Sequence, residues 1–294
     1  MYSSSLRHSL PDILLTALAP AIWGSTYLVT TQLLPSDRPY AAAVLRTLPA
    51  GIALVLLCRR WPGRGQWGRL AVLGALNIGV FQALVFLAAY RLPGGLAALV
   101  AAIQPLLVMV LAWVVERERP ARMAALGAVV GVAGMAALLL SPQTAWDSVG
   151  MAAAAGSAVS MAFGTYLARR WKSEMPVLAF TGWQLLLGGL LVAPLALIAE
   201  PPLPPLSAGN LAGYAYLCLA GALLAYALWF RGLDRLSPVA VSSLGLLSPL
   251  TAVILGWVLL GQAMTGTAML GLLMVLAGVL AVQWATAPRR AASS

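Results

Sequence analysis

The chain has 294 residues, of which 61% are hydrophobic and only 9% are charged. This composition excludes a soluble globular domain and indicates an integral membrane protein. The formal charge of +10 does not indicate a nucleic-acid-binding protein, because the basic residues lie in short gaps between apolar runs.

The first apolar run resembles a signal peptide at one point only. Ala17-Leu18-Ala19 fits a small-x-small cleavage pattern. Pro11 and Asp12 interrupt the run before that point, however, and the chain stays apolar well beyond it. We therefore expect a retained first membrane span.

Apolar segments of nearly equal length follow one another along the whole chain. A spanning helix needs roughly 20 such residues. The connections between them are short and rich in Pro, Gly, Arg and Asp. The sequence therefore predicts an all-α membrane protein with ten transmembrane helices, at residues 13–34, 40–58, 68–90, 94–115, 121–140, 148–169, 176–199, 209–230, 238–260 and 266–286.

Basic residues are distributed unevenly between the two sets of connections. With the N-terminus in the cytoplasm, the outer connections hold only Arg38 and Arg91, and Arg46 lies within a span. The positive-inside rule therefore predicts that both termini are cytoplasmic. The other 15 of the 18 basic residues then face the cytoplasm: Arg7, Arg59, Arg60, Arg64, Arg69, Arg117, Arg119, Arg122, Arg169, Arg170, Lys172, Arg231, Arg235, Arg289 and Arg290.

The chain contains an internal duplication. Residues 90–120 align without a gap on the segment that begins at Asp234, under a shift of 144 positions. The first helices repeat more weakly, and in that alignment Arg46 matches Gln184. The matched pairs include Gln82 and Tyr226, Pro105 and Pro249, Trp113 and Trp257, Gly127 and Gly271, and Gly134 and Gly278.

The duplication predicts two repeats of five spans each, residues 1–145 and 146–294. Because five is an odd number, the second repeat must enter the membrane from the opposite side. Inverted repeats are typical of secondary transporters, whose site lies between similar halves near the membrane midplane. The alternative is a duplicated structural or receptor protein.

Polar groups within the apolar runs are the candidate binding residues. Arg46 could bind a substrate carboxylate or a backbone carbonyl at a gate, or it could snorkel or cap a neighbouring helix. Asn77 and Phe81 share one helix face, and Gln82 lies beside them. With Tyr226, these groups suit a zwitterion with a flat side chain; the alternative is hydrogen bonding between helices.

Gln104 and Ser248 precede the matched prolines Pro105 and Pro249. A proline within a helix frees a carbonyl one turn earlier and makes the helix easier to bend. We therefore expect cavity residues at the first two positions and hinges at the two prolines.

Three aromatic residues are placed by the repeat pattern to face the interior: Trp23, Phe163 and Trp183. The alternative for each is contact with lipid or with the membrane interface. Gly127 and Gly131 form a small-x-x-x-small pattern, which favours close packing of helices within the chain over packing between two copies.

The sequence lacks the residues that proton relays, metal clusters and common catalytic sites require. Acidic residues and histidine are missing from the interior of every predicted span, so a carboxylate proton relay has no obvious members. Cys58 and Cys218 lie at different depths, which argues against a disulfide, and two cysteines with one histidine cannot form a metal cluster. The HExxH, GxSxG and P-loop motifs are absent. We expect no enzyme activity, cofactor or metal.

The chain resembles the EamA branch of the drug/metabolite transporter superfamily. The resemblance rests on Trp23-Gly24-Ser25, Arg46, Gln104-Pro105-Leu106, Ser248-Pro249-Leu250 and the run from Gly256 to Gly261. Family members usually carry a glutamate after the tryptophan-containing run. Here Glu116 and Glu118 are candidates in the first copy, whereas the second copy has Gln262.

The resemblance implies export of small metabolites, often amino acids, across a bacterial inner membrane, and it is greatest to the aromatic amino-acid exporters. The predicted function is facilitative export of small amphipathic metabolites by alternating access. The expected partners are such a substrate and the lipid bilayer, and the chain is expected to be a monomer, with a dimer as the alternative. The alternatives are an antiporter of phosphorylated or nucleotide-linked sugars, a membrane-embedded enzyme, and a receptor or scaffold.

Overall fold

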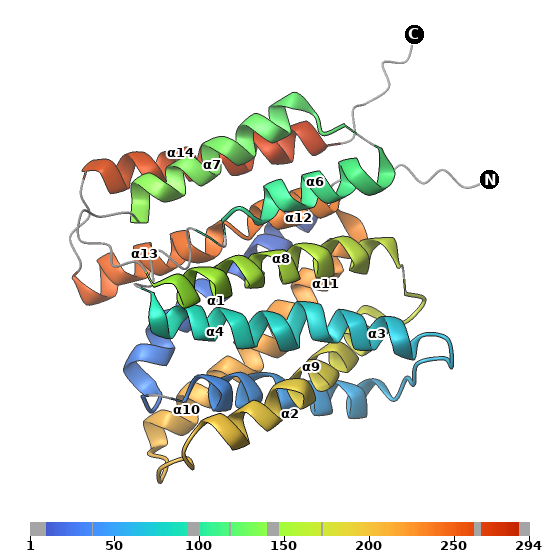
Figure 1. Cartoon of the computed structure of the whole chain (residues 1–294), viewed down its shortest axis with the longest axis vertical. Coiled ribbons are helices and arrows are strands. Elements are labelled where there is room, and N and C mark those ends of the chain that lie inside the picture. Colours follow the sequence, from blue (N-terminus) through green and yellow to red (C-terminus); the bar gives the residue numbers. More distant parts are fainter. Residues whose placement is uncertain are drawn as a thin grey trace.

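In the computed structural model, every regular element among the described residues is a helix (Figure 1). The described residues are 10–36, 38–92, 100, 102–117, 119–139, 147–171, 173–261 and 266–287. The all-helical prediction is confirmed for this part of the chain. The features predicted at Arg7, His8, Glu118, Lys172, Gln262, Arg289 and Arg290 lie outside it.

The helices follow the predicted apolar runs. Those before residue 145 are α1 (Leu10–Leu33), α2 (Pro39–Cys58), α3 (Trp67–Gly74), the π-helical segment η1 (Ala75–Gly79), α4 (Val80–Arg91), α6 (Gln104–Glu116) and α7 (Arg122–Leu139). Those after it are α8 (Ser148–Arg170), α9 (Val177–Ala199), α10 (Ala208–Tyr216), the π-helical segment η2 (Leu217–Leu224), α11 (Ala225–Arg235), α12 (Pro238–Leu244), α13 (Leu247–Leu260) and α14 (Gly266–Thr286).

Eight of the helical segments are long and apolar enough to cross a membrane. The other two predicted spans, 94–115 and 121–140, lie partly outside the described residues, and their described parts contain the apolar helices Gln104–Glu116 and Arg122–Leu138. The chain is therefore a multi-pass membrane protein, and the count of ten spans stays a prediction.

Two helix pairs cross at glycines. Gly127 of α7 lies against Gly278 of α14, and Gly134 lies against Gly271, so tightly that a Cβ atom on any of the four would overlap its neighbour. Helix α2 approaches α9 in the same way, with Gly51 against the backbone of Leu186. Small residues let helix backbones approach closely where lipid supplies no hydrophobic driving force. Gly127 is thus used for packing within the chain.

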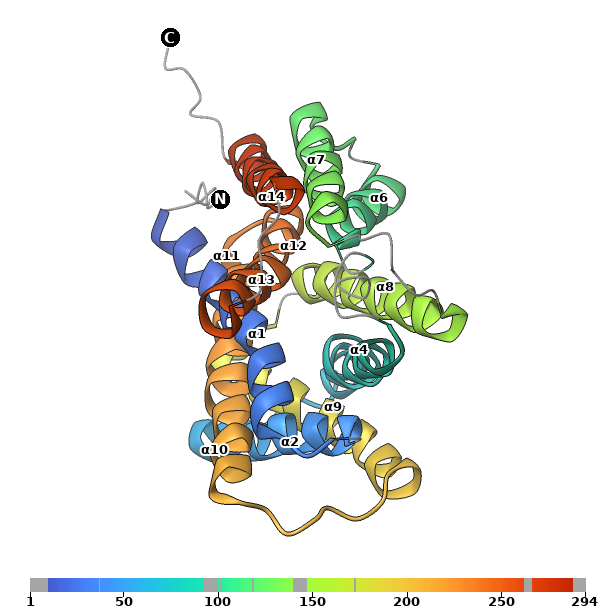
Figure 2. The same cartoon turned by 90° about the vertical axis from the view of Figure 1, so that its left-hand side faces the viewer.

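Six of the remaining helices form two groups that face each other (Figure 2). One group contains α1, α11 and α13, because α1 packs on both of the others. The second group contains α4, α6 and α8, because α8 packs on both of the others. Each group takes helices from before and after residue 145, so the two predicted repeats interleave instead of forming separate bodies.

Acidic side chains fix several helix ends. The Glu200 carboxylate accepts hydrogen bonds from the backbone N–H groups of Tyr40 (2.5 Å) and Ala41 (2.9 Å) at the start of α2. Asp147 accepts from the Gly150 N–H at the start of α8 (2.6 Å) and forms an ion pair with Arg91 at the end of α4 (3.6 Å). These contacts satisfy N–H groups that a helix leaves unpaired in its first turn.

Candidate functional site

Two π-helical segments interrupt the helices that carry Asn77, Phe81, Gln82 and Tyr226. Residues 75–79 of η1 fall on residues 219–223 of η2 under the shift of 144 positions. Side chains of other helices donate to backbone carbonyls in both segments; in η1, Ser160 Oγ donates to Leu76 O at 2.8 Å. π-helical turns are rare and occur frequently at functional sites.

In η2 the carbonyl of Gly221 is the acceptor. Trp23 Nε1 and Arg46 Nη2 each donate to this oxygen at 2.9 Å. Arg46 is buried, with 6% of its surface exposed. Of the two functional interpretations of Arg46, the structure therefore shows the contact with a backbone carbonyl, as a charge-assisted hydrogen bond from α2 to η2.

The residues at the matched positions also contact each other in η1, in this case through their two side chains. Asn77, which matches Gly221, donates through Nδ2 to Oε1 of Gln184, which matches Arg46, at 2.9 Å. Both amides are fully buried. Among the described residues, Asn77 Oδ1 and Gln184 Nε2 have no hydrogen-bond partner. A Cβ atom on Gly164 would overlap Asn77 Oδ1, so the glycine is what allows α8 to pass here.

Gln82 and Tyr226 meet between the two helix groups. Gln82 Nε2 of α4 donates to the Tyr226 hydroxyl of α11 at 3.1 Å, and both side chains are buried. The two residues are 144 positions apart, so they are matched in the alignment of the two copies, and in the structure they are in direct contact.

Aromatic rings surround Tyr226. Its ring centroid lies 4.9 Å from that of Trp23 and 6.0 Å from that of Phe230. Trp229 packs against Trp23 at 5.2 Å and is buried, and its Nε1 donor has no partner among the described residues. The sequence analysis missed Trp229 and Phe230, although both follow Tyr226 within one helical turn.

Gln104 and Ser248 lie beside this cluster. Gln104 Nε2 donates to Thr165 Oγ1 at 3.4 Å, which links α6 to α8. The Ser248 carbonyl packs against Gly24 of α1, where no side chain could fit. Both residues are half-buried, as is Phe81, which packs on the core near Asn77.

Two predicted aromatic residues lie elsewhere. Phe163 is 42% exposed and is not part of the cluster around Tyr226. Trp183 is buried, but its rings pack with Trp61 (5.1 Å) and Trp67 (4.9 Å), and its Nε1 donates to Arg60 O at 2.9 Å. Phe163 and Trp183 therefore lie outside the cluster around Tyr226, because the repeat pattern gives the depth of a residue but not the direction of its side chain. The predicted role of both residues in substrate binding stays a prediction.

The two prolines do not interrupt continuous helices. Pro105 lies in the first turn of α6, which begins at Gln104. Pro249 lies in the first turn of α13, after a break between Leu244 and Leu247. Because Pro249 has no N–H, it cannot donate to the Gly245 carbonyl, which accepts a hydrogen bond from the backbone N–H of Ser248 at 3.1 Å. The prediction of a proline inside each helix is wrong for the described residues, and the hinge role stays a prediction.

The acidic residues near the site are engaged at helix ends. Asp12 forms ion pairs with Arg231 (2.7 Å) and Arg235 (3.2 Å), which joins the start of α1 to the end of α11. Glu116 accepts a hydrogen bond from the Tyr166 hydroxyl at 2.8 Å. Within the described ranges no three His, Cys, Asp or Glu side chains gather as metal ligands, and Cys58 and Cys218 are not bonded to each other.

Comparison with known proteins identifies related chains. The chain is 45% identical over 267 residues to protein PecM of Dickeya dadantii, covering 90% of each chain. It is 30% identical over 254 residues to the WAT1-related protein At3g02690, chloroplastic, of Arabidopsis thaliana, covering 80% of this chain and 60% of that protein. It is 28% identical over 242 residues to the uncharacterized inner membrane transporter YedA of Escherichia coli K12, covering 80% and 78%.

The fold also matches a solved crystal structure, with a TM-score of 0.79 and 22% identity, covering 94% of this chain and 97% of the other. The model of the EamA-like transporter family matches residues 10–140 and 148–284, which is nearly all of the chain. Together with the relative at 45% identity, this match identifies the chain as a member of the EamA-like transporter family.

Proposed function

We propose that the chain is a secondary transporter that exports small amphipathic metabolites, with apolar and aromatic amino acids as the favoured substrates. Transport proceeds by alternating access to a site between the α1–α11–α13 and α4–α6–α8 groups. Two inverted five-helix repeats, residues 1–145 and 146–294, build this site.

One observation carries the proposal. Arg46 contacts Gly221, and the residues at their matched positions, Gln184 and Asn77, contact each other. Contacts between the same two matched positions therefore occur twice with the roles of the two repeats exchanged, once from a side chain to a backbone carbonyl and once between two side chains. This reciprocity is what an inverted repeat around a central axis produces, and such an axis is where transporters of this kind bind substrate.

The chemistry of the centre supports the substrate class. The rings of Trp23, Tyr226 and Trp229 offer flat apolar surface, and Asn77 Oδ1, Gln184 Nε2 and Trp229 Nε1 are polar atoms not engaged by the described residues. Arg46 is the one buried cation in the described part of the chain. A phosphorylated sugar would favour several cations, so these groups fit a zwitterion better.

The bacterial inner membrane is the proposed location. The Escherichia coli relative is named an inner membrane transporter, and the described helices are apolar enough to span a membrane. Under the positive-inside rule, the ends of α8 and α11 then face the cytoplasm.

Counterflow in liposomes tests the proposal. The purified protein is reconstituted, and counterflow is measured for radiolabelled phenylalanine, tryptophan, leucine, glutamate and lysine and for a sugar phosphate. We expect saturable counterflow of the first three. Arg46→Ala should reduce it about tenfold or more, because a hydrogen bond to a charged group contributes roughly 1.5–3 kcal/mol.

Arg64→Ala is the matched control, since it removes the same charge from an exposed connection. It should leave counterflow unchanged. Absence of counterflow for every compound, or preference for the sugar phosphate, would contradict the proposed function.

A further inference from the structure

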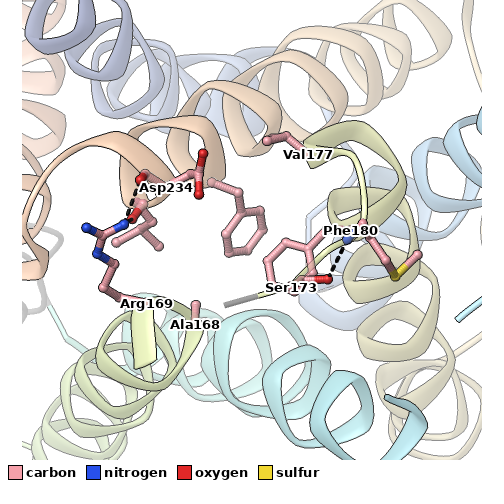
Figure 3. Close-up of a pocket in the computed structure, with 9 residues that line it drawn as sticks. Ala168, Arg169, Ser173, Val177, Phe180 and Asp234 are labelled. Carbon is pink, nitrogen blue, oxygen red and sulfur yellow. Dashed lines mark hydrogen bonds between the residues drawn. The ribbon is translucent and has the colours of Figure 1, made fainter. Parts of the chain in front are cut away.

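A pocket opens at the end of α8, between the connection to α9 and the end of α11 (Figure 3). Its volume is about 100 Å³. Arg169 and Asp234 lie on one side, and Ser173, Val177 and Phe180 lie on the other. The full lining is Ala168, Arg169, Ser173, Met175, Val177, Phe180, Phe230, Leu233 and Asp234.

The polar side of the pocket carries the Asp234 side chain beside the Arg169 guanidinium (Figure 3). Arg169 Nη1 donates to the backbone carbonyls of Leu233 (3.4 Å) and Asp234 (2.6 Å), so it stabilises the C-terminal end of α11. Arg231 and Arg235 both pair with Asp12. Among the described residues, no cation forms an ion pair with the Asp234 carboxylate. Asp234 is exposed at the mouth of the pocket, where a ligand from solvent can reach its carboxylate.

The apolar side is built around two rings. Phe180 and Phe230 pack edge to face, with centroids 5.5 Å apart. Phe230 is buried and Phe180 is half-buried, so the ring of Phe180 presents part of its surface to the pocket. Val177 lies on the side of the pocket away from Asp234 (Figure 3), and Met175 and Leu233 add further apolar groups to the lining. This lining suits an apolar or aromatic group attached close to the positive charge.

We propose that this pocket is an inner-mouth binding site for a primary ammonium that carries an adjacent apolar or aromatic group, as an amino acid does. The ammonium binds the Asp234 carboxylate, and the apolar group packs on Phe180. A cavity of about 150 Å³ holds a benzene molecule, so a pocket of this size takes part of such a ligand and leaves the rest at its open mouth. This inference rests on the proposed transport function.

A continuous series of rings leads from the pocket to the central cluster. Phe180 packs on Phe230, Phe230 stacks on Tyr226, and Tyr226 packs on Trp23. Trp23 in turn donates to the Gly221 carbonyl. The site thus lies where a substrate from the cytoplasm would meet the aromatic path before reaching Arg46.

Protection of an introduced cysteine tests the site. Ser173→Cys is made in a background with Cys58→Ala and Cys218→Ala, and the rate of its modification by an impermeant maleimide is measured in nanodiscs. Phenethylamine and phenylalanine should slow the modification. 3-Phenylpropionate, which has no ammonium, should not. Ser207→Cys, at the exposed start of α10, is the matched control and should be unprotected.

Asp234→Asn should raise the phenethylamine concentration for half-protection roughly two- to fivefold, as expected for an exposed ion pair. Asp234→Glu should restore it. Equal protection by 3-phenylpropionate, or an unchanged half-protection concentration in Asp234→Asn, would overturn the site. Counterflow without protection would overturn the site alone, whereas protection without counterflow would support the site and contradict the transport function.

Discussion

At the scale of single residues, the contact between Gln82 and Tyr226 is the most direct link between sequence and site. The two residues occupy matched positions and form a hydrogen bond of 3.1 Å. Matched residues of an inverted repeat can touch only close to the axis that relates the two copies. In the predicted inverted repeat, the pair would therefore lie at that axis, between α4 and α11.

A double-mutant cycle should detect this contact. Gln82→Leu and Tyr226→Phe each remove one side of the hydrogen bond, and we expect a coupling energy of about 0.6 kcal/mol, the mean for hydrogen bonds between membrane helices. Thermal unfolding of the wild type, both single variants and the double variant in detergent measures it. Fully additive effects would show that the hydrogen bond contributes nothing to stability.

Most of the polar site residues could be predicted from the sequence, because a polar side chain stands out in an apolar run. Arg46, Asn77, Gln82 and Gln104 were found in this way, and all four make hydrogen bonds in the structure. The role of Gly221 could not be predicted, since it acts through a backbone carbonyl that the side-chain pattern does not reveal.

At the scale of helices, Gly164 decides how closely α8 approaches η1. A methyl group there would overlap the amide oxygen of Asn77. Gly164→Ala should therefore destabilise the fold by about 1–3 kcal/mol, the usual cost of overpacking. Asn77→Ala should relieve part of the effect in the double variant.

Gly68→Ala is the matched control for this experiment, because nothing lies within 4 Å of its added methyl group. It should leave the melting temperature unchanged or raise it, since alanine favours a helix by up to about 1 kcal/mol over glycine. An equal loss of stability in Gly164→Ala and Gly68→Ala would contradict the claim that α8 and η1 pack too closely for a side chain at position 164.

The prolines bear on how α6 and α13 move. Pro105 and Pro249 lie in the first turns of α6 and α13, and a new N–H at position 249 would lie one turn after the Gly245 carbonyl. Pro249→Ala should therefore favour a continuous α12–α13 helix and slow counterflow while expression is kept. Pro105→Ala should act likewise. Wild-type rates in both variants would exclude a hinge at either site.

At the scale of the whole molecule, hydropathy predicts the helices because each must bury its backbone polar groups within the bilayer. It does not predict their partners. The sequence divides the chain near residue 145, whereas the helices assemble into mixed groups, with α1 packed on α13 and α6 packed on α8. Glycines that allow the close crossings of α7 with α14 and of α2 with α9 become interpretable only when both partners are known.

Energy coupling depends on the whole set of buried charges. In the described part of the chain, the buried charged side chains are Arg46 and Asp12, and Asp12 is held by Arg231 and Arg235. Arginine stays protonated at every accessible pH. We expect facilitated, electroneutral movement, so a pH gradient across the liposome should not concentrate phenylalanine. Accumulation well above equilibrium driven by the pH gradient alone would demonstrate coupling.

Alternating access between the two helix groups is the central claim, and distances measured across both mouths test it most directly. Spin labels at Leu10 and Glu174 report on the cytoplasmic mouth, and labels at Gln32 and Val149 report on the outer mouth; all four positions are exposed. On addition of saturating phenylalanine, pulsed electron–electron double resonance should show that the distance across one mouth increases while the distance across the other mouth decreases. Two distances that stay fixed, or that change in the same direction while counterflow proceeds, would contradict the account.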